Sequence, residues 1–213
     1  MKVLVTAGPT REAIDPVRFV SNRSSGKMGV AIAEQFAERG ANVTLVLGPS
    51  RLSPKSPNIT VVRVESAQQM YEASVQHFEN AEIVVLSAAV ADYRPAHVAE
   101  QKIKKKGDGM TIELEKTPDI AASLGKMKRP GQFIVGFALE TNDELQNANE
   151  KLLKKNFDFI VLNSLQDAGA GFNFDTNKIT ILHRDNMRKD FELKTKAEVA
   201  KDIVNEVLES LSK

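Results

Sequence analysis

Short runs of apolar and β-branched residues alternate along most of this 213-residue chain with longer stretches of helical spacing. The first run, KVLVTA, is typical of a buried strand, and similar runs give strands at residues 2–7, 42–47, 59–64, 82–88, 132–138 and 158–163. Helical spacing is found at residues 25–39, 67–78, 143–155 and 195–211. Near-continuous apolar strands separated by helices favour a mostly parallel sheet covered on both faces. The sequence therefore predicts an α/β fold with a Rossmann-like sheet, in one domain spanning residues 1–213.

Two segments break this alternation. Residues 111–116 (TIELEK) alternate apolar and charged side chains and follow a run of lysines, which is typical of an exposed strand or hairpin arm. Residues 178–184 and 189–194 flank the turn-like DNM and predict a hairpin near the C-terminus. The sequence thus adds small β elements to the main sheet.

Composition excludes several classes of site. The chain contains no cysteine, so it has no disulfide, no thiolate metal ligand and no cysteine nucleophile. The formal net charge of +1 gives no general electrostatic reason to bind nucleic acid or a membrane surface. No apolar run approaches the roughly 18 residues needed to cross a bilayer. We therefore expect a cytoplasmic protein without nucleic-acid or membrane partners.

A glycine-rich loop after the first strand predicts anion binding. This loop, SNRSSGKMG at residues 21–29, leads into the first helix, and Ser24, Ser25 and Gly26 stand at the helix start. Free amides at a helix N-terminus bind phosphate groups with the help of the helix dipole. A structural alternative is that a serine caps the helix while Gly26 and Gly29 only permit close packing.

Neither standard nucleotide fingerprint is present. A dinucleotide site needs G-x-G-x-x-G and an acidic residue after the second strand. Here that strand ends in LVLGPSR, where Arg51 would suit the 2′-phosphate of NADP. A Walker A loop needs Gly-Lys-Ser or Gly-Lys-Thr, whereas the chain has Gly26-Lys27-Met28. An NAD(P)-dependent Rossmann-type oxidoreductase is therefore a weaker alternative, and a non-catalytic nucleotide-binding module is another.

The stretch SAAVADYRP at residues 87–95 offers groups for a planar or phosphate ligand. Ala88 and Ala89 allow close approach to the backbone. Asp92 is suited to sugar hydroxyls or a cation, or alternatively to capping a helix. The stretch follows a predicted buried strand, so these groups are expected at the edge of the sheet where ligands bind.

Further candidate binding groups follow. The lysine run at residues 102–106 is either a solvated face or a flap that closes over a triphosphate. KTPDIA at residues 116–121 starts a helix and supplies free amides. Lys151 and Lys155 lie four residues apart on one helical face. Phe137 ends a strand, where it either contacts a ligand or packs in the core.

Six stretches together resemble the phosphopantothenate–cysteine ligase family: TAGPTREAIDPVRFVSNRSSGKMG, SAAVADYRP, KIKK, KTPDI, VGFALET and GFNFDTN. They cover nearly the whole chain in the family's order, and the first is highly specific. The resemblance implies a ligase that joins 4′-phosphopantothenate to L-cysteine in coenzyme A biosynthesis. In the bacterial, CTP-dependent type, CTP converts the pantothenate carboxylate to an acyl-cytidylate and pyrophosphate, and cysteine then displaces CMP. Many bacterial members are fused to a flavin-dependent phosphopantothenoylcysteine decarboxylase, which the resemblance implies as a partner domain or protein.

The resemblance also implies roles for individual residues. Asn22 would donate to an acyl oxygen of the acyl-cytidylate and assist the second half-reaction, and Lys102 would neutralise the triphosphate in the first. Mg²⁺ would be the cofactor, held by Asp92 directly or only through water and phosphates. The family is homodimeric, and residues 102–116 are expected to reach the neighbouring subunit's site. CTP would be bound by Lys102 together with Ser24, Ser25, Gly26, Leu86, Ser87, Ala88, Ala89, Asp92, Pro118, Asp119, Ile120, Ala121, Phe137, Lys151 and Lys155.

Overall fold

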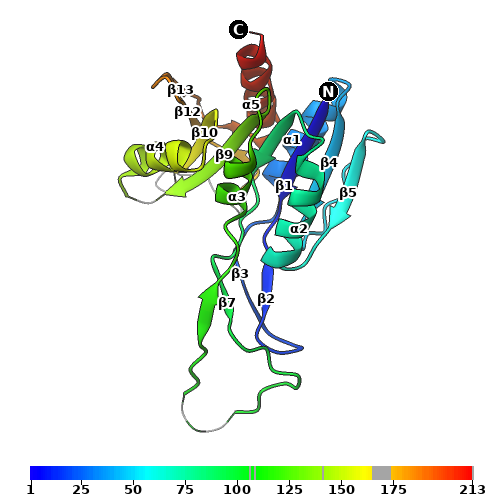
Figure 1. Ribbon diagram of the computed structural model, residues 1–213, viewed down its shortest axis with the longest axis vertical. Coiled ribbons are helices and arrows are strands. Elements are labelled where there is room, and N and C mark those ends of the chain that lie inside the picture. Colours follow the sequence, from blue (N-terminus) through cyan, green and yellow to red (C-terminus); the bar gives the residue numbers. More distant parts are fainter. Residues whose placement is uncertain (106, 108, 141, 165–173, 213) are drawn as a thin grey trace.

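The computed structural model describes residues 1–105, 107, 109–140, 142–164 and 174–212. Lys106 of the lysine run, Thr141 of VGFALET and residues 171–173 of GFNFDTN lie outside the described residues. Within the described part, an eight-stranded sheet runs through the molecule and helices lie on both of its faces (Figure 1). This arrangement confirms the predicted α/β fold.

The sheet has the strand order β13–β12–β10–β9–β6–β1–β4–β5. Its parallel strands are β1 (Lys2–Ala7), β4 (Asn42–Leu47), β5 (Ile59–Arg63), β6 (Ile83–Leu86), β9 (Phe133–Glu140) and β10 (Phe159–Ser164). The chain proceeds outward from β1 to β4 and β5 on one side, and to β6, β9 and β10 on the other. Doubly wound dinucleotide-binding sheets have this order and bind ligands at the carboxyl ends of the strands, where the order reverses. In this chain the reversal lies between β1 and β6.

Each face of the sheet has its own hydrophobic core. Neighbouring residues of β1 point to opposite faces, Val5 into one core and Leu4 into the other. Phe36 of the first helix is in the Val5 core, and Met70 and Leu152 are in the Leu4 core. The Val5 side is covered by α1 (Lys27–Glu38) and α5 (Lys196–Leu211), and the other by α2 (Ala67–Phe78), α3 (Ile120–Met127) and α4 (Glu144–Lys154).

In the described part of the chain, no helix combines the length and the apolar character needed to span a membrane.

Helix α1 begins without a side-chain cap, unlike α2 and α5, whose first turns are closed by capping boxes. It starts at Lys27, and Gly26 occupies the N-cap position with a φ of 82°. The hydroxyls of Ser24 and Ser25 accept only long hydrogen bonds, of 3.3 and 3.5 Å, from the amides of Gly26 and Lys27. The alternative in which a serine caps this helix is therefore wrong. The predicted start at residue 25 is also two residues early, because the left-handed Gly26 interrupts helical geometry.

Two hairpins project from the carboxyl edge of the sheet and form an arm, which consists of residues 11–21 and the described residues between 93 and 116 (Figure 1). The first pairs β2 (Arg11–Ala13) with β3 (Phe19–Ser21), and the second pairs β7 (Tyr93–Pro95) with β8 (Leu114–Lys116). The predicted arm strand at residues 111–116 is thus shorter, three residues long. The first hairpin was not predicted at all.

The C-terminal hairpin is also shorter than predicted. Strand β12 (Ile179–His183) pairs with β10 and with β13 (Arg188–Asp190), both antiparallel. The predicted second strand at residues 189–194 therefore continues only to Asp190. The chain then forms β14 (Lys194–Thr195), which pairs with β11 (Thr176–Asn177) in a separate small sheet. This pairing places the start of α5 next to the end of the 174–177 segment.

Gly29 allows α1 to lie unusually close to the sheet. A Cβ atom at this position would lie 2.4 Å from the Cβ of Ala7 and 2.5 Å from the Oγ of Ser87. These distances are far below van der Waals contact, so only glycine fits between β1 and the loop after β6. The position of the glycine-rich loop against the sheet therefore depends on Gly29.

We expect Gly29→Ala to lower the free energy of unfolding by about 1–3 kcal/mol, the usual cost of overpacking. Urea denaturation monitored by circular dichroism measures this change. Gly109→Ala is the matched control, because an added Cβ there meets nothing within 4 Å. Equal unfolding midpoints for the two variants would contradict the close approach at Gly29.

Candidate functional site

A cavity of about 570 Å³ opens at the carboxyl ends of β6 and β9. Its walls are the loop after β6, the segment before α3, the end of β9 and one face of α4. It lies beside the reversal of strand order, and its volume suits a ligand of nucleotide size. Twelve of the expected CTP-binding residues line it: Leu86, Ser87, Ala88, Ala89, Asp92, Pro118, Asp119, Ile120, Ala121, Phe137, Lys151 and Lys155.

A second cavity of about 50 Å³ lies at the start of α1. Ser24, Ser25 and Gly26 line it, so the remaining expected CTP-binding residues except Lys102 are found here. The large and the small cavity share the side chains of Ser87, Phe137, Leu139 and Asn163. The uncapped start of α1 is therefore the immediate neighbour of the nucleotide-sized cavity.

Hydrogen bonds hold the loop after β6, residues 87–92, against the end of β1. The amide of Ser87 donates to the Thr6 carbonyl at 3.2 Å, and the Ser87 hydroxyl donates to the same oxygen at 2.7 Å. Ala89 donates to the Gly8 carbonyl at 2.9 Å, and Ala91 donates to Oγ1 of Thr10 at 3.0 Å. The loop therefore has a defined shape that does not depend on a ligand.

Asn22 lines neither cavity but is bonded directly to this loop. Its side-chain Nδ2 donates to the carbonyl oxygens of Ala89 at 2.9 Å and Val90 at 3.0 Å. The amide therefore has no free N–H for the expected donation to an acyl oxygen, because both hydrogens are already used. Its Oδ1 is left as an acceptor, and none of the described residues donates to it. In this conformation Asn22 links β3 to the loop that follows β6.

Lys151 of α4 and Lys155, which caps the C-terminus of that helix, are each held by a carboxylate. Lys151 Nζ lies 2.5 Å from Oε1 of Glu140, and Lys155 Nζ lies 3.1 Å from Oδ1 of Asp119. Burial alone would raise the pKa of Asp119, but the amide of Ala122 and the neighbouring Lys155 lower it below its ordinary value. Asp119 is thus ionised at neutral pH, where it both caps α3 and orients Lys155.

Asp92 is an exposed carboxylate on the cavity wall, and no partner for its side chain is found in the described part of the chain. No group of three or more His, Asp or Glu side chains among the described residues could hold a metal ion. Mg²⁺ usually keeps several waters and binds through one or two carboxylates together with substrate phosphates. Asp92 therefore fits a cation that arrives with a phosphate ligand, and does not fit a site built only from protein groups.

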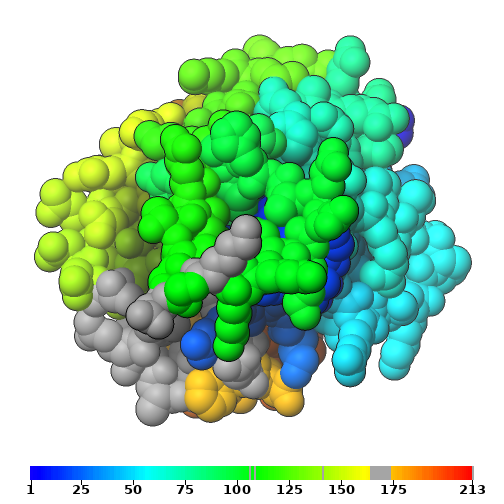
Figure 2. Space-filling view, turned by 90° about the horizontal axis from the view of Figure 1, so that it is seen from below, coloured from blue at the N-terminus to red at the C-terminus, as the bar shows by residue number. Residues whose placement is uncertain are grey.

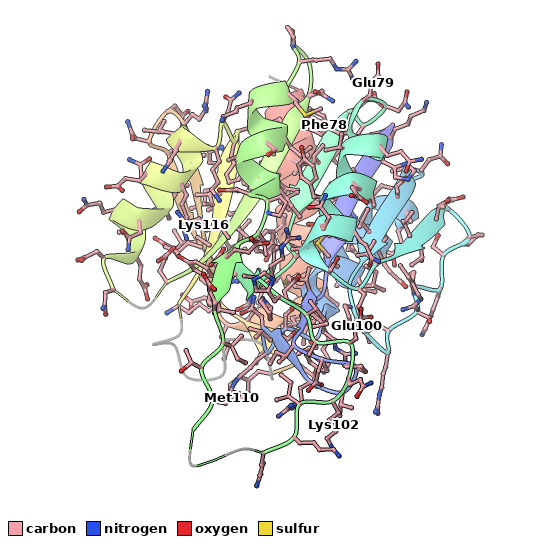
Figure 3. The ribbon with its side chains drawn as sticks, turned by 60° about the horizontal axis from the view of Figure 1, so that its bottom comes forward. Phe78, Glu79, Glu100, Lys102, Met110 and Lys116 are labelled. Carbon is pink, nitrogen blue, oxygen red and sulfur yellow. The ribbon has the colours of Figure 1, made fainter. Side chains whose placement is uncertain are left out.

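Lys102 lies on the arm and outside both cavity walls. Its side chain is exposed, and Figure 3 shows it on the outer part of the arm, away from Lys116, which does line the large cavity. Seen from below, the second hairpin of the arm, in green, covers the centre of this face and blue N-terminal residues lie beside it (Figure 2). The wall of the cavity in a single chain is thus formed without Lys102.

The structure adds residues that were not among the expected binding residues, although Tyr93 and Lys116 lie in the stretches SAAVADYRP and KTPDIA. Tyr93, Lys116 and Asn163 line the large cavity, and Lys196 lines the small one. Lys196 is 8% exposed, donates to the Phe174 carbonyl at 2.6 Å, and has a pKa lowered by burial. It begins α5, far from the glycine-rich loop in sequence. Only the packing of α5 beside α1 brings it there, so no local signal could have identified it.

Comparison with known proteins gives consistent matches over the whole chain. Residues 1–211 match the family described as DNA/pantothenate metabolism flavoprotein C-terminal domain. The chain is 50% identical over 214 residues to the coenzyme A biosynthesis bifunctional protein CoaBC of Haemophilus influenzae, with 100% of this chain and 52% of that protein covered. It is 56% identical over 207 residues to a cysteine/cysteine sulfinic acid decarboxylase of an unknown prokaryotic organism, with 97% and 58% covered. The chain thus spans about half the length of the curated relatives it matches.

A solved structure agrees with this match. The crystal structure of the C-terminal domain of a coenzyme A biosynthesis bifunctional protein CoaBC has a TM-score of 0.84 and 45% identity to the chain. The alignment covers 99% of this chain and 95% of that one. The similarity therefore extends over nearly the whole chain.

Removing one lysine from the cavity wall tests whether the cavity binds a nucleotide. In Lys151→Met, a nucleotide loses one hydrogen bond from a charged donor, so we expect the Kd for Mg·CTP to rise about tenfold or more. Isothermal titration calorimetry measures the change. Lys154→Met is the matched control, because Lys154 is exposed on the same helix and does not line the cavity. Equal affinities of the two variants would argue against nucleotide binding through Lys151.

Proposed function

Because the chain belongs to the family of DNA/pantothenate metabolism flavoprotein C-terminal domains, we propose that it joins 4′-phosphopantothenate to L-cysteine in coenzyme A biosynthesis. The proposal rests mainly on the two adjoining cavities, one of nucleotide size and one at the uncapped start of a helix. A ligase of this kind has to hold a nucleotide and a phosphate-bearing acid side by side. The CoaBC relatives are named for coenzyme A biosynthesis, which agrees with this chemistry.

In the proposed first half-reaction, a carboxylate oxygen of 4′-phosphopantothenate attacks the α-phosphorus of CTP, and pyrophosphate leaves. The enzyme supplies no nucleophile, so its contribution is alignment and charge neutralisation. The large cavity holds CTP beside Lys151 and Lys155, and the start of α1 receives phosphate oxygens. Lys102 offsets the charge that develops on the leaving pyrophosphate. Mg²⁺ bound to the phosphates and to Asp92 would supply further positive charge at the same oxygens.

In the proposed second half-reaction, the cysteine amine attacks the acyl carbon of the acyl-cytidylate, CMP leaves, and the amine loses a proton. Asn22 keeps its Nδ2 on the carbonyls of Ala89 and Val90, which holds the loop in place. Its Oδ1 is then the group that accepts a hydrogen bond from the attacking amine. The donation to an acyl oxygen that the family resemblance implies would require Nδ2 to leave one of these carbonyls.

Other activities are less well supported by the chain itself. An NAD(P)-dependent oxidoreductase would share the strand order, but the loop after β1 lacks the G-x-G-x-x-G fingerprint. One relative is named for the decarboxylation of cysteine and cysteine sulfinic acid, and the chain spans 58% of that protein. A test of the proposed function should therefore measure the release of carbon dioxide from cysteine as well as the ligase reaction.

The arm supports the further proposal of a homodimer. Among its described residues, six large hydrophobic side chains are exposed by 45% or more: Val17, Phe19, Tyr93, Val98, Met110 and Leu114. Clusters of exposed apolar groups mark interaction surfaces. A second copy of the chain would cover them and bring Lys102 toward the neighbouring cavity. A sedimentation-velocity mass of one chain at micromolar concentration would contradict the dimer.

A decarboxylase is the second proposed partner. The bifunctional relative is about twice as long as this chain, which covers 52% of it. We propose that this partner is a flavin-dependent phosphopantothenoylcysteine decarboxylase, either joined to this chain as it would be in a bifunctional protein or present as a separate protein. Such a partner would consume the product of the ligase.

Pyrophosphate release with 4′-phosphopantothenate and Mg²⁺ tests the proposed function, with CTP or ATP and with or without cysteine. With CTP we expect one equivalent of pyrophosphate per site without cysteine, and multiple turnovers once cysteine is added. No release with either nucleotide would contradict the ligase, and nucleotide-independent carbon dioxide from cysteine would favour a decarboxylase. Turnover with ATP but not CTP would contradict only the CTP-dependent type.

Asn22→Asp should separate the two half-reactions. A carboxylate cannot donate to the carbonyls of Ala89 and Val90 and faces them with negative charge. We expect the pyrophosphate burst to persist while product formation falls about 100-fold, because the side chain is repelled from the two carbonyls and its oxygen no longer lies where the attacking amine is to donate. Mass spectrometry of quenched reactions would show the acyl-cytidylate accumulating. Asn80→Asp adds the same charge outside the site as a control, and normal turnover by Asn22→Asp would remove Asn22 from the mechanism.

A further inference from the structure

The segment that carries Lys102 is attached to the first hairpin through an ion pair whose carboxylate is buried and whose guanidinium is partly exposed. The Asp15 side chain is 0% exposed, and Arg18 donates to its Oδ2 from Nε at 3.0 Å and from Nη2 at 2.5 Å. Ile103, the residue after Lys102, contacts both members of the pair. Its amide donates to Asp15 Oδ2 at 3.1 Å, and its carbonyl accepts from Arg18 Nη2 at 3.0 Å. Both backbone polar groups of Ile103 are thus fixed by one ion pair.

The other oxygen of Asp15 organises the turn between β2 and β3. Oδ1 accepts from the amides of Val17 and Arg18, each at 2.9 Å. Arg18 holds the pKa of Asp15 well below its usual range, with support from the backbone amides and against the effect of burial. The carboxylate therefore stays charged, and a buried charge is tolerated only when it is paired and hydrogen-bonded as this one is.

Ile103 is the main attachment point of its segment. Among the described residues from 100 to 112, Ile103 alone forms hydrogen bonds to the rest of the chain. Before this segment in the sequence, the nearest hydrogen bond to the first hairpin is made by Ala99, whose amide donates to the Ile14 carbonyl at 3.0 Å. The direction in which the Lys102 side chain extends from the arm therefore depends on how the backbone of the neighbouring Ile103 is held.

We propose that Asp15 is a positioning residue for Lys102, acting through its ion pair with Arg18 and the backbone of Ile103. The proposal rests on the proposed function, because the role of Lys102 does. The same hairpin continues from β3 directly into Asn22. Asp15 therefore sets the relative placement of the two side chains assigned to the two half-reactions, although it touches neither substrate.

Limited trypsin digestion tests the attachment without any activity measurement. Losing the carboxylate in Asp15→Asn should speed cleavage after Lys102, Lys104 and Lys105 about tenfold, because local opening becomes more frequent. Glu65→Gln is the matched control, because it breaks the Arg11–Glu65 pair at 3.6 Å, which joins the same hairpin to the segment after β5 and does not involve Ile103. Circular dichroism melting confirms that each variant is folded.

Arg18→Lys provides a second variant in case Asp15→Asn does not fold. It keeps the positive charge but loses the planar group that reaches both Asp15 and the Ile103 carbonyl. We expect faster cleavage in this variant too, with a smaller change. Cleavage at the parent rate in the folded variants would overturn the attachment.

A double-mutant cycle on the pyrophosphate burst tests the positioning itself. Asp15→Asn should slow the burst about tenfold, and adding it to Lys102→Gln should cause no further loss, because both act through Lys102. If the double variant instead loses the product of the two single losses in burst rate, Asp15 does not act through Lys102. That result would overturn the positioning role and indicate that Asp15 only stabilises the structure. If the parent enzyme releases no pyrophosphate, the proposed function fails, and the trypsin result still decides whether Asp15 holds the segment.

Discussion

The site depends on the hydrogen bonds that join the end of β1 to the end of β6. At a reversal of strand order the two connections leave the sheet in different directions and open a crevice. Here the loop after β6 stays bonded to β1 beyond the last paired residues, through Ser87 and Ala89 to the carbonyls of Thr6 and Gly8. The loop thereby forms a wall with small side chains at Ala88 and Ala89, and the crevice keeps room for a ligand.

Three lysines around this crevice are each paired with a carboxylate. Lys151 and Lys155 are bonded to Glu140 and Asp119, and Lys27 at the small cavity lies 2.5 Å from Asp175. Several unpaired cations in one cavity would repel each other without a ligand, whereas each pair limits that repulsion and fixes the direction of the ammonium group. Oriented charges need little reorganisation when a polyanion arrives, which is the condition for strong electrostatic stabilisation of a transition state.

Local patterns were enough to predict the main elements but not what joins them. The spacing of apolar residues gave α2 and β4 with the observed bounds, and the order of motifs predicted the family that residues 1–211 match. The start of α1 was misplaced because a left-handed Gly26 has no hydrophobic signature.

Long-range contacts explain the remaining differences. The hairpin of β2 and β3 depends on a buried Asp15, whose partner Ile103 is 88 residues away. Lys196 reaches the site only through the packing of α5 beside α1. Twelve expected residues do line one cavity, while their roles in binding remain predictions.

The position of Lys102 outside the cavity wall has a consequence for the proposed reaction. A lysine fixed in the wall would bind CTP, the transition state and pyrophosphate alike, and uniform binding does not speed the chemical step. A lysine on an arm, held at Ile103, contributes binding only while the arm lies over the site. Pyrophosphate can then leave without breaking every contact made in the transition state. In the proposed reaction, placing this charge on the arm while Lys151 and Lys155 remain in the wall would separate holding the nucleotide from neutralising its leaving group.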